Sequence, residues 1–168
     1  MVQSQLTTSF RSEAELIDFA GEFARRLASA KCRPLVIGLD GTLGSGKTTW
    51  ARAMLRGLGY AGRVPSPTYT LLEHYAVGEL SVVHLDLYRL AGDAELENLG
   101  LREWLADRNA WVVFEWPERA PRLAARCDLV LEFVDAANDA RRVTLRALTA
   151  AGRNALGFAH QASVKNDS

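Results

Sequence analysis

Residues 41–48 read Gly41-Thr42-Leu43-Gly44-Ser45-Gly46-Lys47-Thr48, which fits the pattern G-x-x-x-x-G-K-[ST]. The apolar run 35–39 precedes this loop, and a segment of helical character, 49–58, follows it. Strand, glycine-rich loop and helix in this order are typical of a phosphate-binding loop, or P-loop. Such a backbone can approach a triphosphate closely enough to aim successive N–H groups and a helix N-terminus at its oxygens. We therefore expect the loop and the following Thr49 to bind a nucleotide rather than form a turn that binds nothing.

A P-loop requires a carboxylate on a neighbouring strand to hold Mg²⁺ directly or through water. Lys47 is expected at the β- and γ-phosphates, and the Thr48 hydroxyl at the metal. Asp86 and Glu115 each end an apolar run, and open α/β sheets bind ligands at the carboxyl ends of their strands. Thr48, Asp86 and Glu115 are therefore the predicted metal site, the alternative for either acid being a solvated carboxylate at a strand end.

The composition bounds the class of protein. The 168 residues, 48% of them hydrophobic, fit a single domain over 1–150, with 151–168 expected as a loosely ordered tail. Twenty basic and twenty acidic residues cancel, so no overall positive field holds nucleic acid or an anionic membrane. The two cysteines suggest neither a disulfide framework nor a zinc site. A polar N-terminus and the lack of a long apolar run predict a soluble, cytoplasmic protein without a membrane contact.

The periodicity of apolar residues predicts an α/β fold. We expect a P-loop NTPase-like three-layer sandwich, whose mixed, mostly parallel sheet carries an additional β-hairpin. Ser12 and Glu15 have the spacing of a capping box and begin an amphipathic helix. The other expected elements are an extended loop at 63–70, a hairpin of 68–77 with 80–87, a helix at 93–107, a buried strand at 110–116 and a hairpin of 129–134 with 142–148.

Four motifs together point to a known family. They are Gly-x-Leu-Gly-Ser-Gly-Lys-Thr-Thr at 41–49, Ser-Pro-Thr-Tyr-Thr-Leu at 66–71, His-Leu-Asp-Leu-Tyr-Arg-Leu at 84–90 and Phe-Glu-Trp-Pro at 114–117. In this order and spacing, the chain closely resembles the TsaE (formerly YjeE) family, the small P-loop ATPases of bacterial tRNA threonylcarbamoyladenosine (t6A) modification. The resemblance covers residues 12–148.

The resemblance implies roles for individual residues. Lys47 and Thr48 would bind the phosphates and Mg²⁺ of ATP or ADP. Asp86 would supply the acidic metal-site residue, and Thr68 would belong to a mobile switch-like loop. Glu115 would orient the attacking water or complete the second shell of the metal, with Trp116 packed beside the nucleotide.

One position departs from the family pattern. The family usually has an acid directly after the first glycine of the loop, where this chain has Thr42, with Asp40 just before the glycine. The resemblance also implies TsaB and TsaD as partners, and contact with tRNA only through that complex.

The residues, together with the family resemblance, leave three functions from different classes open. The leading one is a slow ATPase that acts as a switch on TsaB–TsaD. A small-molecule kinase is the alternative, although 118–126 is the only candidate for an arginine-bearing lid. A nucleotide-sensing module would keep Lys47 and Thr48 and make Glu115 structural. A GTPase is disfavoured because no N-K-x-D motif is present. His84 is interpreted as a packed strand residue.

Overall fold

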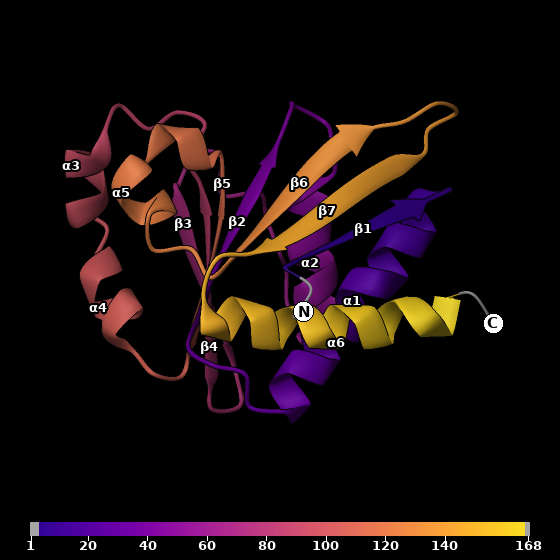
Figure 1. Cartoon of the computed structure of the whole chain (residues 1–168). Helices are drawn as coiled ribbons and strands as arrows, with labels where there is room; N and C mark the ends of the chain where they lie inside the picture. Colours follow the sequence, from indigo (N-terminus) through magenta and orange to yellow (C-terminus); the bar gives the residue numbers. More distant parts are fainter. Residues whose placement is uncertain (1–3, 167–168) are drawn as a thin grey trace.

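The computed structural model describes residues 4–166 and contains one seven-stranded mixed sheet (Figure 1). The order of the strands across the sheet is β1-β7-β6-β2-β5-β4-β3. Their bounds are β1 (Gln5–Phe10), β2 (Leu35–Gly41), β3 (Leu72–Val77), β4 (Leu80–Asp86), β5 (Ala110–Glu115), β6 (Leu129–Asp135) and β7 (Arg141–Ala147). The helices are α1 (Glu13–Ser29), α2 (Lys47–Gly57), α3 (Asp93–Glu97), α4 (Leu101–Ala106), α5 (Pro121–Ala124) and α6 (Ala150–Asn166), and a 3₁₀ turn, η1, spans Pro117–Arg119.

The centre of the sheet is parallel and its edges are antiparallel. β2 pairs in parallel with β5 and β6, and β4 pairs in parallel with β5. The β3–β4 and β6–β7 hairpins and the pairing of β1 with β7 are antiparallel. The predicted α/β class, mixed sheet and both hairpins are therefore confirmed. The carboxyl ends of β2, β4 and β5 meet at one edge of the sheet, where a ligand site is expected.

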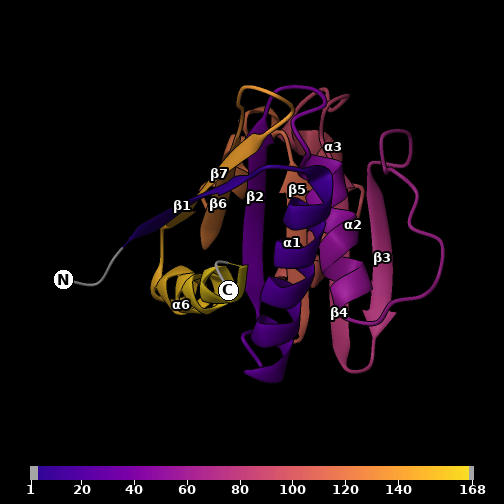
Figure 2. The ribbon, with the colours of Figure 1, turned by 90° about the vertical axis from the view of Figure 1, so that its right-hand side faces the viewer.

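Helices cover both faces of the sheet. One apolar core joins α1, α2 and α6 to the sheet, and a second joins α3, α4 and α5 to the opposite face. Figure 2 shows α1 and α2 side by side against the first face. Trp50 of α2 is fully buried there and contacts the rings of Phe10, Phe19, Phe23 and Phe133. These aromatic contacts fix α2, and with it the P-loop, against the sheet.

The predicted start of the first helix is confirmed, but its capping differs from a full capping box. The Ser12 hydroxyl accepts a hydrogen bond from the Glu15 N–H at 3.2 Å. The Glu15 carboxylate accepts from the N–H of Arg11, at 2.7 Å, instead of from that of Ser12. Glu15 also accepts a hydrogen bond from the Arg11 side chain, at 2.9 Å.

The prediction of a loosely ordered tail over 151–168 is wrong for the residues that the structure describes. Residues 150–166 form α6, and residues 167–168 lie outside the described part. Thr149 begins the helix, because its hydroxyl accepts from the Gly152 N–H at 3.1 Å and donates to Asp128 at 2.6 Å. The buried side of α6 consists mainly of small residues, Ala155, Leu156, Ala159 and Ala162. Alanine gives a weak hydrophobic period, which explains why the helix was not predicted.

Two other elements differ from expectation. The edge strand β1 was not predicted, because most of its residues are polar and give no hydrophobic alternation, although in the structure they alternate strictly between exposed and buried or partly buried. The single helix predicted over 93–107 is two short helices, α3 and α4. Gly100, with φ of 70°, separates them, because this left-handed backbone interrupts a right-handed helix. Among the helices of the described residues, none combines the length and apolar character needed to cross a bilayer.

Candidate nucleotide site

The P-loop forms a concave backbone between β2 and α2. Gly44 and Gly46 have φ of 76° and 111°, a conformation that favours glycine, and α2 begins at Lys47 directly after them. Ser45 is 1% exposed, and its hydroxyl has no hydrogen-bond partner among the described residues. Buried polar groups are normally paired. A turn of backbone N–H groups, a helix N-terminus and an unpaired hydroxyl together fit a phosphate.

Lys47 lies folded against its own loop. Its ammonium donates to the carbonyl oxygens of Gly41 and of Thr42, the latter at 2.9 Å. It also lies 3.8 Å from the centre of the Trp116 ring, a cation–π contact. Burial lowers the pKa of Lys47 below its ordinary value, and the carboxylate of Glu115 acts in the opposite direction.

Trp116 adopts an unusual backbone conformation that places its ring at the loop. Its φ is 63°, which is uncommon for a bulky residue, and its N–H donates to Leu39 of β2 at 3.2 Å. The ring also lies 5.0 Å from that of Tyr88. The structure places Trp116 against the P-loop lysine, while the expected packing of its ring beside a nucleotide stays a prediction.

Glu115 is held in a buried network. It is 2% exposed at the end of β5. One carboxylate oxygen accepts from the Thr48 hydroxyl at 2.8 Å, and the other is 3.0 Å from Nε2 of His84. His84 is a packed strand residue, as interpreted from the sequence, but it also contacts the predicted site acid. That contact depends on the register of β4 and β5, which the sequence does not reveal.

Asp86 contacts the loop that precedes β3. Its Oδ2 accepts from the Thr68 hydroxyl at 3.1 Å, and the Thr68 hydroxyl lies 2.7 Å from that of Ser66. The other oxygen, Oδ1, accepts from the N–H of Tyr88 at 3.1 Å. Asp86 and Glu115 are direct register partners in the β4–β5 pair. The structure therefore brings together the two predicted acids and the predicted loop residue Thr68.

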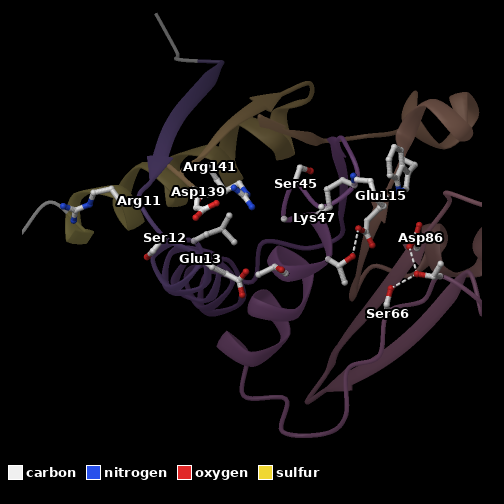
Figure 3. A pocket seen from close by; sticks show the side chains of 18 of the residues that line it. Arg11, Ser12, Glu13, Ser45, Lys47, Ser66, Asp86, Glu115, Asp139 and Arg141 are labelled. Atoms are coloured by element: carbon white, nitrogen blue, oxygen red, sulfur yellow. Dashed lines mark hydrogen bonds between the residues drawn. The ribbon is translucent and has the colours of Figure 1, made fainter. Parts of the chain in front are cut away.

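A cavity of about 720 Å³ joins these groups (Figure 3). Its lining includes the predicted residues Leu43, Gly44, Ser45, Gly46, Lys47, Thr48, Thr49, Thr68, Asp86, Glu115 and Trp116. Gly41 and Thr42, predicted as nucleotide contacts, do not line it; they line a smaller cavity of about 470 Å³. Their carbonyl oxygens bind Lys47 instead.

The sequence did not predict which residues line the end of the large cavity that lies away from Asp86 and Glu115. Residues from the start of α1 and from the β6–β7 turn line it, namely Arg11, Ser12, Glu13, Leu16, Asn138, Asp139 and Arg141. Figure 3 shows this group on the other side of the P-loop from Glu115 and Asp86. Asn138 and Asp139 both have positive φ. Asn and Asp are common at such turn positions, so the turn itself could be predicted from the sequence. Nothing in the sequence indicated that this turn reaches the P-loop.

The residues present fit Mg²⁺ only together with a nucleotide. Within residues 4–166, no group of three or more His, Cys, Asp and Glu side chains is arranged to hold a metal ion. Mg²⁺ is usually bound through one or two carboxylates, waters and substrate phosphates rather than by an all-protein cage. Thr48 and Asp86 offer oxygen atoms at the cavity wall beside the P-loop, which is the donor set such a composite site needs.

Comparison with known proteins identifies relatives along most of the chain. A family model described as "Threonylcarbamoyl adenosine biosynthesis protein TsaE" matches residues 10–143. The Haemophilus influenzae protein named tRNA threonylcarbamoyladenosine biosynthesis protein TsaE is 37% identical over 150 residues, which are 89% of this chain and 94% of that protein. A Streptomyces coelicolor protein of the same name is 38% identical over 136 residues, covering 76% and 89%. The crystal structure of Bacillus subtilis YdiB superposes with a TM-score of 0.71 and 26% identity, covering 100% of this chain and 99% of that one.

Proposed function

The chain belongs to the TsaE family, and on that premise we propose that it is a slow, Mg²⁺-dependent ATPase of tRNA t6A biosynthesis. The observation that carries the proposal is the cavity in which a P-loop meets two acids from adjacent strands. Lys47 and Thr48 come from the P-loop helix, and Asp86 and Glu115 from the ends of β4 and β5. This is the arrangement of groups that phosphoryl transfer requires. A role in tRNA modification supports a cytoplasmic location, which is part of the proposal.

The phosphates would lie along the P-loop. The backbone N–H groups of 44–48 and the hydroxyl of Ser45 would bind them, and Lys47 would exchange its carbonyl partners for phosphate oxygens. When bound with the nucleotide, Mg²⁺ would neutralise the charge that develops on the transferred phosphoryl group. Thr48 and Asp86 would hold the metal, with Glu115 behind Thr48. The nucleoside would occupy the end of the cavity at Arg11, Asn138 and Arg141.

The switch would be the loop before β3. Thr68 links this loop to Asp86, so a change at the metal site is transmitted to residues 66–71. Hydrolysis by the chain alone would be slow, because water and γ-phosphate are not held in a reactive geometry until a partner orders the loop. We propose that the TsaB–TsaD complex is that partner. The balanced charge of the chain agrees with contact with tRNA only through that complex.

The test follows the γ-phosphate of radiolabelled ATP. The chain is incubated with a panel of nucleosides and metabolites, and separately with TsaB and TsaD. We expect label only in inorganic phosphate, at a rate that rises with TsaB and TsaD. Label in an organic acceptor, formed faster than phosphate is released, would support the small-molecule kinase instead.

A further inference from the structure

His84 is a buried group for which the proposed reaction has no role yet. The side chain is 1% exposed, and Nδ1 has no hydrogen-bond partner among the described residues. An imidazole that leaves one ring nitrogen unpaired is more costly in a core than an apolar side chain. Packing alone therefore does not explain histidine at this position.

The partner of Nε2 suggests what the residue does. Nε2 lies 3.0 Å from Glu115, and because an ionised carboxylate only accepts, Nε2 carries the proton and donates it. His84 and Glu115 are diagonal neighbours across β4 and β5, since His84 pairs with Val113 and Asp86 pairs with Glu115. Diagonal pairs are within reach of long side chains on one face of a sheet. The contact is therefore fixed by the strand register.

Glu115 connects His84 to the P-loop helix. Its second carboxylate oxygen accepts the proton of the Thr48 hydroxyl at 2.8 Å. A threonine hydroxyl has one proton and two lone pairs. When the proton points to Glu115, the lone pairs are free for a cation on the cavity side. A carboxylate that turned away would leave the Thr48 hydroxyl free to rotate.

We propose that His84 is a positioning residue of the nucleotide site: its Nε2–H holds the Glu115 carboxylate, which keeps the Thr48 hydroxyl oriented towards Mg²⁺. The inference rests on the proposed function, because the metal is the one that accompanies ATP. It assigns a role to a residue two positions before the predicted metal acid Asp86. Partners that orient a metal-binding group typically change metal affinity or activity by about 10- to 100-fold when they are removed.

Two amide substitutions separate this role from packing. In His84→Gln the side-chain amide can place an N–H near the position of Nε2, whereas in His84→Asn the N–H lies near that of Nδ1. Both variants bury a neutral amide, and only the glutamine keeps the donor next to Glu115. His74→Gln and His74→Asn are matched controls, because His74 lies on β3 in contact with Trp104 and Ser81, away from the cavity.

Calorimetry and kinetics provide the functional readouts. The first readout is the factor by which Mg²⁺ increases ATP affinity. For His84→Asn we expect this factor to be about 10-fold smaller than in the wild type, and kcat to be lower by about 10-fold or more. KM for ATP with Mg²⁺ should rise by the same factor of about 10, because KM equals the dissociation constant when turnover is slow. ATP affinity without Mg²⁺ should stay within about 3-fold, because the phosphate contacts of the P-loop are unchanged. His84→Gln should keep all of these properties near the wild type. Equal behaviour of the two variants, whether both active or both inactive, would overturn the proposal.

A measurement without nucleotide keeps the test independent of ATP. The unfolding equilibrium constant of His84→Asn should exceed that of His84→Gln by about 10-fold, because the asparagine leaves a buried carboxylate with one hydrogen bond fewer. Equal stability would show that the contact to Glu115 does not hold the carboxylate. A wild-type chain that does not bind or hydrolyse ATP would instead overturn the proposed function.

Discussion

The two acids of the cavity differ in what holds them. Glu115 bonds to Thr48 in the first turn of α2 and to His84 in β4, and every residue of β5 is buried. Asp86, its register partner, bonds to Thr68 in a loop whose neighbouring Tyr69 is 81% exposed. Glu115 thus belongs to a rigid wall of the cavity, formed by β5 (110–115). Asp86 connects that wall to the loop 65–71, which has few buried contacts. Segments of that kind open at low free-energy cost.

The largest effect is expected for a substitution of Lys47, on the same side of the cavity as Glu115. Lys47→Ala removes the one P-loop ammonium in the cavity lining, and loss of its charged hydrogen bonds should weaken ATP binding by about 100-fold or more. Isothermal titration calorimetry measures the affinity, with Arg102→Ala as a control that removes an exposed cation on α4. An affinity equal to that of the wild type would refute the assignment of the P-loop.

Glu115→Gln is expected to have the next largest effect, on turnover. The swap keeps the size of the side chain and removes the charge that orients Thr48, so kcat should fall by about 100-fold or more, the scale of a positioned acid or base. ATP binding should persist, because the P-loop is intact. The exposed Glu97→Gln serves as the control for a charge change. A kcat equal to that of the wild type would make Glu115 a structural acid and would leave hydrolysis to the other groups of the cavity.

Asp86→Asn should have a smaller effect on kcat and a larger one on the loop. On its proposed role at the metal, we expect kcat to fall by at least the factor of about 10 to 100 that is typical for the partners of metal ligands. An asparagine accepts more weakly from Thr68, so amide exchange in 65–71 should become faster than in Glu115→Gln. Mass spectrometry of exchanged peptides compares the two variants. Equal exchange in both would show that the acids do not differ in this way.

Thr68→Val is expected to have the smallest effect. It removes one hydrogen bond to Asp86, which is worth about 1 kcal/mol, so turnover should fall by about 5-fold. Thr70→Val is a matched control in the same loop, because the Thr70 hydroxyl donates to Glu73 at 2.8 Å instead. If both variants lowered turnover equally, the effect would come from the loop as a whole and not from the contact to Asp86.

The P-loop and the two acids of the site could be predicted from local patterns in the sequence. The P-loop is a contiguous motif, and an acid that ends an apolar run lies at the carboxyl end of a strand wherever the strand pairs. The contact of His84 with Glu115 needed the register of β4 and β5, since a shift of one residue would turn His84 to the other face. Arg11 and Arg141 reach the cavity from distant parts of the chain, and no local pattern reports such an approach.

The elements that were missed share weak periodicity. In α6 the buried side is mostly alanine, and in β1 the alternation involves threonine and serine more than large apolar residues. Both elements are stabilised by what they pack against. β1 completes the sheet beside β7, and α6 packs on the same core as α1. Tertiary packing of this kind overrides weak local preference.

Hydrogen–deuterium exchange of the wild-type chain, bound to ADP or to a non-hydrolysable ATP analogue with Mg²⁺, compares the wall and the loop directly. Amides of 65–71 should be protected differently in the two states, because contacts to the γ-phosphate and its metal are the source of differential free energy in such switches. Amides of 110–115 should exchange alike in both. Identical exchange of 65–71 in the two states, or a change confined to 110–115, would contradict the division of the site into a rigid wall and a nucleotide-responsive loop.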